Sequence, residues 1–333
     1  MQSERENLIM KKEYADVFEN ARKFIYRNAR PIELACWRYH FENGTQEEVL
    51  TALSYYQNDG GGFGHGLEAD CWNPYSSPIQ TWQATEILRG IGFTDGGHAV
   101  IQGILRYLDS GSDFSQEHDQ WRNVILTNND HPHACWWEYG KDGGEFKYNP
   151  TACLAGFIIR FADKNSGLYK KACKIAEQAC GWLLSNLPMD DSHVISCFIR
   201  LYEYCSEAGK TDLFDMEKLI SILKEQVSLN ICKDTEKWGK EYVTLPSRFI
   251  SSSDSIFFED NKEAAAAECE FIINSQLSDG SYSVPWQWWT EYREYETAAN
   301  WWKSVMIINN MLFLTQTSVL AQTSVLAQTA QFA

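Results

Sequence analysis

The feature that most constrains this sequence is a helical period in its apolar residues, which returns in segment after segment. Apolar residues recur at positions i, i+3, i+4 and i+7, which lie on one face of an α-helix, whereas the two-residue alternation of a half-buried strand is nearly absent. The pattern predicts about eleven helices joined mostly by short connections. We therefore expect an all-α chain whose helices either stack in a line or close into a ring. The clearest segments are 14–24, 84–91, 154–161, 168–182 and 298–312.

Glycine-rich turns follow several of the predicted helices. The pattern DGGxF occurs at residues 59–63 and 142–146, and DGSY at residues 279–282 is a close variant. Gln57 and Gln276 close the helices before the first and third of these turns. In such a turn the aspartate accepts a hydrogen bond from a nearby backbone amide, the glycines adopt the positive φ angles that end a helix, and the aromatic ring packs on a neighbour. These turns are internal repeats.

An apolar helix end, a glutamine, a glycine-rich turn with an aspartate and then an aromatic residue resemble the QW-type repeat of squalene-hopene cyclases and of protein prenyltransferase β subunits. The resemblance covers roughly residues 11–314. It implies an all-α (α/α)6 toroid of about twelve helices in a single domain, with inner and outer helices around a central cavity. Three further strings are similar to a bacterial group described as prenyltransferase-like: QNDGGGFGHGLEADCWNP at 57–74, HPHACWW at 131–137 and NPTACLAG at 149–156.

The end of the sequence departs from this pattern. The string QTSVLA at residues 316–321 is repeated at 322–327 and begins again at Gln328. This period fits neither a helix face nor a strand, so we expect a low-complexity tail over residues 315–333, frayed helix or disordered, with no catalytic role. The toroid domain is accordingly expected over residues 1–314.

Charge and composition exclude several classes of function. The chain carries 45 acidic and 29 basic residues, and its net charge of −16 repels nucleic acid and anionic lipid headgroups. No apolar run reaches the roughly 18 residues of a membrane span, and the first residues lack the apolar stretch of a signal peptide. The ten cysteines form no CxxC pair and are typical of reduced, buried thiols. We therefore expect a cytoplasmic protein with no nucleic-acid partner and no membrane span.

The sequence indicates no particular cofactor. Nothing resembles a GxGxxG fingerprint before a helix or a GxxxxGKS/T phosphate loop, so the cofactor is left unassigned. Prenyltransferase β subunits hold zinc through an aspartate and a cysteine that are separated by one residue, whereas Asp70 and Cys71 are adjacent, so no metal site is predicted. Asp190 and Asp191 lack the first acid of the DxDD motif of class II terpene cyclases and are expected to cap a helix near His193.

The densest polar cluster follows the first glycine turn and contains His65, Glu68, Asp70 and Cys71, with Trp72 beside them. Loops at one rim of a helical toroid open onto its cavity. A carboxylate pair there could protonate an alkene or a glycosidic oxygen, while an aromatic wall stabilises the resulting cation. The alternative is structural: Glu68 and Asp70 cap the following helix or hold the loop through hydrogen bonds to its glycine-rich backbone.

Two imidazoles and two indoles lie together in the HPHACWW segment. Either His131 or His133 could serve as an acid or base near neutral pH, and the tryptophans could stack on a sugar or a prenyl chain. The alternative is a proline-shaped loop whose tryptophans fill the core. A second group of tryptophans, between residues 286 and 302, poses the same choice. The tryptophans predicted to line the binding cavity are Trp72, Trp136, Trp137, Trp286 and Trp289.

These features support one leading hypothesis and leave two alternatives open. The leading hypothesis is a cytoplasmic enzyme, a transferase or cyclase, that acts by acid/base chemistry on a hydrophobic, isoprenoid-type small molecule in a central aromatic-lined cavity. Glu68 and Asp70 would be its acid/base or anchoring groups, assisted by His65, His131 and His133. The first alternative is a carbohydrate-active enzyme, such as a glycosidase, epimerase or lyase, with a glycan ligand. The second is a binding or scaffold protein without catalytic activity.

Overall fold

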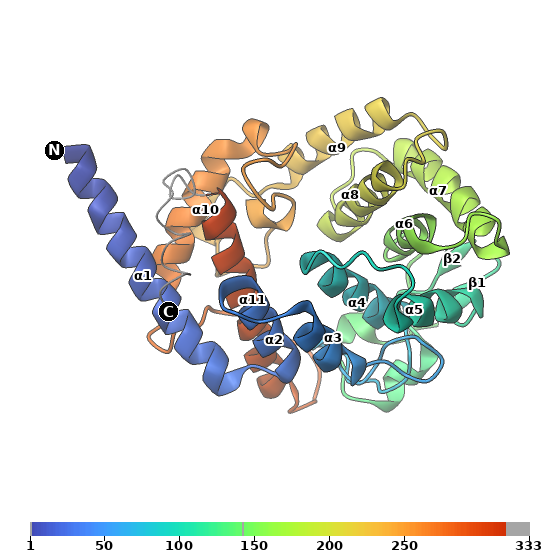
Figure 1. The fold of residues 1–333 in the computed structure, drawn as a ribbon, viewed down its shortest axis with the longest axis horizontal. Coiled ribbons are helices and arrows are strands. Elements are labelled where there is room, and N and C mark those ends of the chain that lie inside the picture. Colours follow the sequence, from blue (N-terminus) through green and yellow to red (C-terminus); the bar gives the residue numbers. More distant parts are fainter. Residues whose placement is uncertain (1, 142, 318–333) are drawn as a thin grey trace. The chain divides into compact units, whose positions relative to one another are not determined.

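The computed structural model describes residues 2–141 and 143–317, with side chains described from Tyr14 onward. Over this part of the chain the structure is mostly helical with one small antiparallel sheet, which confirms the all-α prediction (Figure 1). The α-helices, α1 to α11 in chain order, are Gln2–Asn28, Pro31–Phe41, Gln46–Ser54, Pro78–Gly90, Ala99–Asp109, Thr151–Phe161, Gly167–Ser185, Ser192–Glu207, Met216–Asn230, Lys262–Ser275 and Tyr295–Thr317. The strands are β1 (Phe114–Ser115) and β2 (Gln120–Trp121). Short 3₁₀ helices, η1 to η5, are Leu126–Asp130, Cys135–Trp137, Thr235–Lys237, Pro246–Arg248 and Glu259–Asn261.

The described residues divide into two compact units. The first takes the described parts of Met1–Val49, Ile231–Gln287 and Glu296–Ala333, and the second takes Leu50–Asn230 and Trp288–Tyr295. Helices α1, α2, α10 and nearly all of α11 therefore belong to the first unit, while α4 to α9 and both strands belong to the second. Closure of the helices into a single (α/α)6 toroid stays a prediction.

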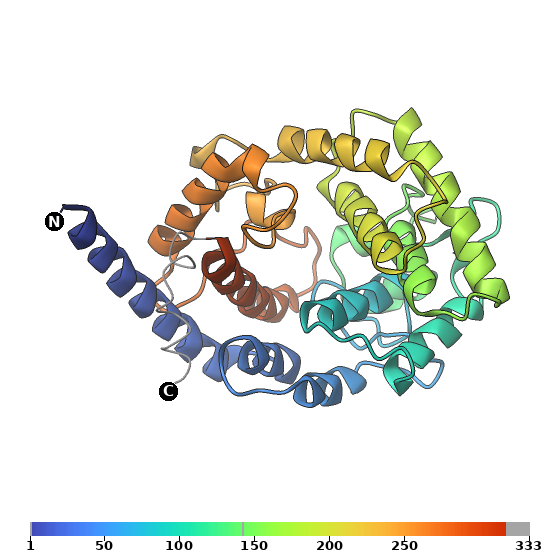
Figure 2. The ribbon, with the colours of Figure 1, turned by 45° about the horizontal axis from the view of Figure 1, so that its top comes forward.

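Helix α6 forms the centre of the second unit. Its residues from Thr151 to Ile159 are all buried, and it packs against α7 and α8, which lie beside it in both ribbon views (Figures 1 and 2). The contact with α8 is close because Gly156 has no side chain: a Cβ there would lie 3.1 Å from Leu201 Cα and from Tyr204 Cβ. The apolar, small-residue sequence of α6 thus explains why this helix is enclosed by its neighbours.

Polar side chains cap the helices of the second unit where the sequence changes from loop to helix. Ser77 caps α4 and Ser166 caps α7, each by accepting a hydrogen bond from a backbone amide in the first turn. Asp191 caps α8, because its Oδ1 accepts from the amides of His193 (2.9 Å) and Val194 (3.3 Å). The predicted capping role of Asp191 is confirmed.

The first glycine turn, which follows α3, contacts α5 within the second unit. The side-chain amide of Gln57 donates to the carbonyl oxygens of Gly61 (2.9 Å) and Val100 (3.3 Å). Gly61 has φ +94°, and a Cβ at this position would lie 2.0 Å from the carbonyl oxygen of Gly103. Only glycine therefore allows both the turn and its close contact with α5.

The third turn repeats this arrangement in the first unit. Gln276 Nε2 donates to the carbonyl oxygens of Gly280 (3.1 Å) and Val17 (2.8 Å). Gly280 has φ +92°, and its Cβ would lie 2.1 Å from the carbonyl oxygen of Asn20 in α1. The two turns are thus structural repeats, in which a glutamine and a glycine attach a turn to a helix that is distant in sequence.

The middle turn is built differently. Asp142 lies outside the described residues, and no glutamine precedes it. Gly143 and Gly144 have positive φ angles of 68° and 92°, but a Cβ on either glycine would first meet side chains such as Arg122 and Asn123, not a helix backbone. The DGGxF string alone therefore does not determine whether a turn contacts a distant helix. That contact occurs in the two turns that follow a glutamine, Gln57 and Gln276.

Two further expectations concern the C-terminal tail and the absence of a membrane-spanning helix. Helix α11 continues to Thr317, and the remainder of the predicted tail, residues 318–333, lies outside the described residues. Among the helices that the structure describes, none combines the length and the apolar character needed to cross a bilayer.

Candidate functional site

Backbone hydrogen bonds bring three segments of the second unit together: residues 64–73, 131–137 and 288–295. These bonds run from Trp72 N to Pro132 O (2.9 Å), from Ala134 N to Asp70 O (2.9 Å) and from Cys135 N to Trp288 O (3.0 Å). All three segments were predicted to carry site residues, with Trp289 in the third, and the structure places them next to each other. The third is separated from the second by 150 residues of sequence.

Asn73 fixes the first of these segments to its neighbour. Its buried side-chain amide donates to Thr127 Oγ1 and Asn128 Oδ1, both at 2.9 Å, and its carbonyl oxygen accepts from Gln80 Nε2 at 2.9 Å. These bonds tie the loop to the 3₁₀ helix η1 and to the first turn of α4. The loop that carries Glu68 and Asp70 is therefore rigidly supported.

Asp70 lies at the centre of the candidate site. Its side chain is 3% exposed, and its Oδ1 accepts a hydrogen bond of 2.5 Å from the indole Nε1 of Trp288, which is itself 1% exposed. A carboxylate acquires a hydrogen-bond partner of this kind when burial has removed it from water. The contact joins residues 218 positions apart in sequence.

Glu68 and Cys71 flank Asp70, and both are buried. Glu68 Oε1 accepts from the backbone amide of Asp70 at 3.4 Å, so this carboxylate does hold the loop, while the cap of α4 is Ser77. Burial, together with the neighbouring carboxylates, raises the pKa of the Cys71 thiol to about 12. Cys71 is therefore protonated at neutral pH and is neither a nucleophile nor a thiolate ligand.

Aromatic rings pack around Trp288, the hydrogen-bond partner of the Asp70 carboxylate. The ring of Trp288 makes edge contacts with Trp72 (6.4 Å between centroids), Tyr292 (6.5 Å) and Tyr295 (6.2 Å). Burial and the charge of Asp70 raise the pKa of Tyr295. We call Asp70, Trp72, Trp288, Tyr292 and Tyr295 the Asp70 cluster. A positive charge that develops within it would meet both a carboxylate and several aromatic rings.

His133 lies at the edge of the Asp70 cluster. Its ring centroid is 5.5 Å from that of Tyr292, and its Nδ1 is 2.6 Å from the carbonyl oxygen of His131. Because a carbonyl only accepts, Nδ1 carries the hydrogen, and in the neutral ring Nε2 is then the basic nitrogen. The ring of His131 instead contacts Tyr75, at 5.9 Å. Of the two histidines, His133 is therefore the one placed beside the cluster.

His65 points to a different neighbour. Its side chain is exposed, and its Nε2 lies 2.9 Å from Asn58 Oδ1 in the first glycine turn. Its φ of 59° is in the left-handed region, which a histidine adopts only when the surrounding loop imposes it. The structure thus associates His65 with the turn and not with the aromatic rings around Asp70.

The predicted tryptophans are dispersed. Trp72 belongs to the Asp70 cluster, and Trp137 is half-buried in the adjoining 3₁₀ helix η2. Trp136 is 40% exposed and Trp289 is 75% exposed. Trp286 belongs to the first unit, where its ring lies edge-on to Tyr242 (5.7 Å) and Trp302 (5.3 Å).

The sequence prediction missed Tyr292 and Tyr295, and it considered Trp288 only as one of the tryptophans between residues 286 and 302, without choosing it as a site residue. Their spacing of four and three residues is typical of one helix face, but only Tyr295, the first residue of α11, is in a helix. The segment before it is irregular and folds back onto the 131–137 segment. A cluster of aromatic residues in one unusual string, QWWTEYREY, was the available signal.

A buried carboxyl group in the first unit was also missed. Glu268 in α10 is fully buried, and its two oxygens accept from the amide (2.7 Å) and the hydroxyl (2.5 Å) of Ser247. Burial raises its pKa to about 7. Glu268 lies three residues after Ala265 and four before Ile272, which are both buried, so the helical spacing does place it on the inner face of α10, but its residue type alone would be expected in solvent.

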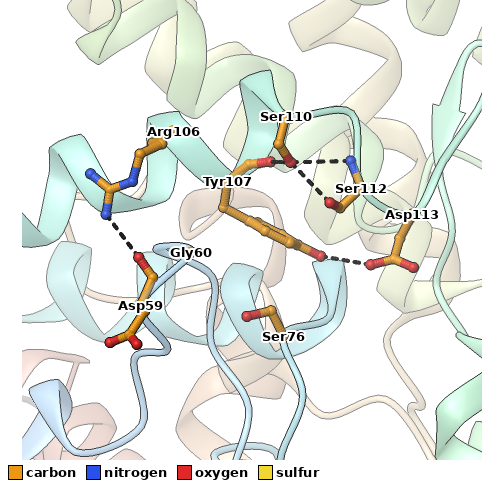
Figure 3. Close-up of a pocket in the computed structure, with 8 residues that line it drawn as sticks. All are labelled: Asp59, Gly60, Ser76, Arg106, Tyr107, Ser110, Ser112 and Asp113. Atoms are coloured by element: carbon orange, nitrogen blue, oxygen red, sulfur yellow. Dashed lines mark hydrogen bonds between the residues drawn. The ribbon is translucent and has the colours of Figure 1, made fainter.

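A pocket of about 570 Å³ lies elsewhere in the second unit, beside the first glycine turn (Figure 3). None of the predicted site residues lines it. Within the described part of the chain, no three histidine, cysteine, aspartate or glutamate side chains are grouped in a way that could hold a metal ion.

Comparison with known proteins found no family model, no curated protein and no solved structure that matches the chain. The chemistry of the site therefore has to be inferred from its geometry. A buried carboxylate with a fixed N–H donor, an imidazole with a basic Nε2 and several aromatic rings together suit proton transfer to or from a bound molecule, with stabilisation of positive charge.

Proposed function

We propose that this chain is a cytoplasmic enzyme, a transferase or cyclase related to the terpenoid cyclases and prenyltransferases, that acts by acid/base chemistry on a hydrophobic, isoprenoid-type small molecule. Asp70 is the acid/base group, Glu68 shapes its loop, and His133 assists proton transfer. Trp72, Trp288, Tyr292 and Tyr295 surround the reacting region.

One observation carries the proposal: the buried Asp70 carboxylate is held by the Trp288 N–H within a group of aromatic rings. Reactions of isoprenoids pass through carbocations. Ring faces stabilise such cations, and a fixed carboxyl group can protonate an alkene or remove the proton that restores one. Cation stabilisation and proton transfer are needed at the same place, and the Asp70 cluster offers aromatic rings for the first and a carboxyl group for the second. The QW-type turns support the same class from sequence.

The experiment compares ligand-induced stabilisation of the wild-type protein and the Asp70→Asn variant. Asparagine keeps an oxygen that can accept the Trp288 N–H but cannot exchange a proton. The control is Asp191→Asn, the same change at a helix cap, where asparagine caps as well as aspartate. The probes are prenyl diphosphates with Mg²⁺, neutral polyprenols, and mono- and disaccharides. A ligand that binds the native state raises the unfolding midpoint in a concentration-dependent way.

We expect isoprenoid probes to raise the midpoint of the wild type and of Asp191→Asn, and product formation from them to be lost in Asp70→Asn. Stabilisation by saccharides alone, abolished in Asp70→Asn, would replace the proposal with the carbohydrate-active alternative. If no probe responds to the Asp70 change, the scaffold alternative is favoured and the proposal is wrong.

A further inference from the structure

The pocket beside the first glycine turn is a second candidate binding site in the same unit. Its volume of about 570 Å³ falls within the roughly 300–1,000 Å³ of small-molecule sites. It is formed by the glycine turn, Ser76, the end of α5 and the turn that follows α5 (Figure 3). The residues that carry the argument are Asp59, Ser76, Arg106, Tyr107, Ser112 and Asp113.

Asp113 is held in position on one side of the pocket. The hydroxyl of Tyr107 donates to its Oδ2 at 3.0 Å, and its φ of 57° is in the left-handed region. Ser110 stabilises the same turn, because its Oγ donates to the carbonyl oxygen of Tyr107 (2.6 Å) and contacts the hydroxyl of Ser112 (3.0 Å). Burial raises the pKa of Asp113, while the hydrogen bond from Tyr107 and the charge of Arg122 act in the opposite direction. A ligand hydroxyl would supply a further donor to this carboxyl group.

Arg106 lies on the other side of the pocket, near the glycine turn (Figure 3). Its Nη2 donates to the backbone carbonyl oxygen of Asp59 at 3.3 Å, which uses one of the five N–H groups of the guanidinium. Within the described residues, Arg106 forms no ion pair. Figure 3 shows Ser76 and the Tyr107 ring between Arg106 and Asp113, so donors and acceptors alternate across the pocket.

The charges of the lining select among ligand classes. Among the lining residues, Asp59 and Asp113 oppose one cation, Arg106. Arg122, outside the lining, also acts on Asp113, and the whole chain carries a net charge of −16, so an anion gains no net attraction. A small cation would have to face Arg106. A neutral molecule with several hydroxyl groups suits the pocket best, since each hydroxyl can donate to a carboxylate and accept from arginine or serine.

We infer that this pocket binds a neutral, polyhydroxylated ligand of the size of a mono- or disaccharide, with Asp113 and Arg106 as its main polar contacts. The site is separate from the Asp70 cluster, and the inference does not depend on the function proposed for that cluster. It adds a saccharide-type ligand to the molecules that the chain recognises.

The test measures binding of maltose, cellobiose and glucose to the purified protein by isothermal titration calorimetry, with sodium phosphate and putrescine as charged comparators. The diagnostic variant is Asp113→Asn, because asparagine tolerates the left-handed backbone and still accepts from Tyr107. The matched control is Asp119→Asn, which lies at φ 52° but outside the pocket. Arg106→Gln is the second diagnostic variant, and the circular dichroism of every variant is compared with that of the wild type.

We expect at least one saccharide to bind, with Asp113→Asn and Arg106→Gln each weakening it about tenfold and Asp119→Asn leaving it unchanged. Asp70→Asn should also leave this binding unchanged, which separates the result from the test of the proposed function. The inference is wrong if no saccharide binds at up to about 50 mM, if phosphate or putrescine binds instead, or if neither pocket variant weakens binding.

Discussion

Replacing Glu268 with glutamine should change how the stability of this protein depends on pH. Glu268 is fully buried in α10, and burial raises its pKa from 4.5 to about 7, although the hydroxyl and the backbone amide of Ser247 both donate to the carboxylate. The native state therefore holds this proton more tightly than the unfolded state. Between pH 4.5 and about 7, unfolding releases the proton, so this group lowers the stability of the wild type as the pH rises.

The size of the effect follows from the two pKa values. The interval between 4.5 and about 7 corresponds to about 3 kcal/mol at 1.36 kcal/mol per pKa unit. Most of it, about 2.5 kcal/mol, develops between pH 5 and 8. Glutamine has the same shape and does not titrate. The stability of Glu268→Gln relative to the wild type should therefore rise by about 2.5 kcal/mol over this range, whatever the fixed cost of the amide itself.

The assay is urea unfolding of the wild type and Glu268→Gln, each measured at half-unit steps of pH. Other carboxyl groups titrate equally in both proteins and cancel in the difference. The control is Glu270→Gln, the same substitution at an exposed position two residues further along α10. A difference for Glu268→Gln that changes by less than about 0.5 kcal/mol between pH 5 and 8 would refute the reasoning.

Three contacts are tested by substitution, each followed by urea unfolding at pH 7. Gly61→Ala should cost about 3 kcal/mol or more, because its Cβ meets a carbonyl oxygen at 2.0 Å and its φ is +94°. The control Gly60→Ala, where a Cβ meets nothing within 4 Å, should cost less than about 0.5 kcal/mol. Similar losses for the two variants would contradict the turn geometry. Trp288→Phe should cost about 2 kcal/mol or more, because it removes the N–H that Asp70 accepts and leaves a cavity beside the smaller ring, and no loss would argue against that bond. Asp191→Ala should cost about 1 kcal/mol and Asp191→Asn almost nothing; equal effects would contradict the cap.

The sequence allowed the local parts of this structure to be predicted. Helical periods in the apolar residues correctly indicated an all-α chain, because burial of one helix face leaves a pattern within a few turns. The cap at Asp191 was predictable for the same reason, since an N-terminal cap concerns only the next three residues. The loop at Glu68 and Asp70 was recognised as a polar cluster, and the structure does bury both carboxylates.

The environment of that cluster could not be read from the sequence. Asp70 meets Trp288 across 218 positions, and nothing in either local string indicates the other. Trp286, Trp288 and Trp289 look equivalent as a string, yet Trp288 is 1% exposed, Trp289 is 75% exposed and Trp286 belongs to the first unit. Which of several adjacent tryptophans is buried depends on the path of an irregular segment, and no periodicity describes such a segment.

The two structural repeats differ at the residue that follows their shared glycine, and the difference follows the packing of each copy. Both turns use a glutamine and a glycine to hold a distant helix, and the residue after that glycine is Gly62 in the first copy and Ser281 in the second. At Gly62 a Cβ would lie 2.7 Å from the Tyr107 ring and from Ser76 Cβ, both in the wall of the pocket. The additional glycine is therefore required because the first turn also packs closely against Tyr107 of α5 and against Ser76. The differences between the repeats thus follow the local packing of each copy, which the shared motif does not determine.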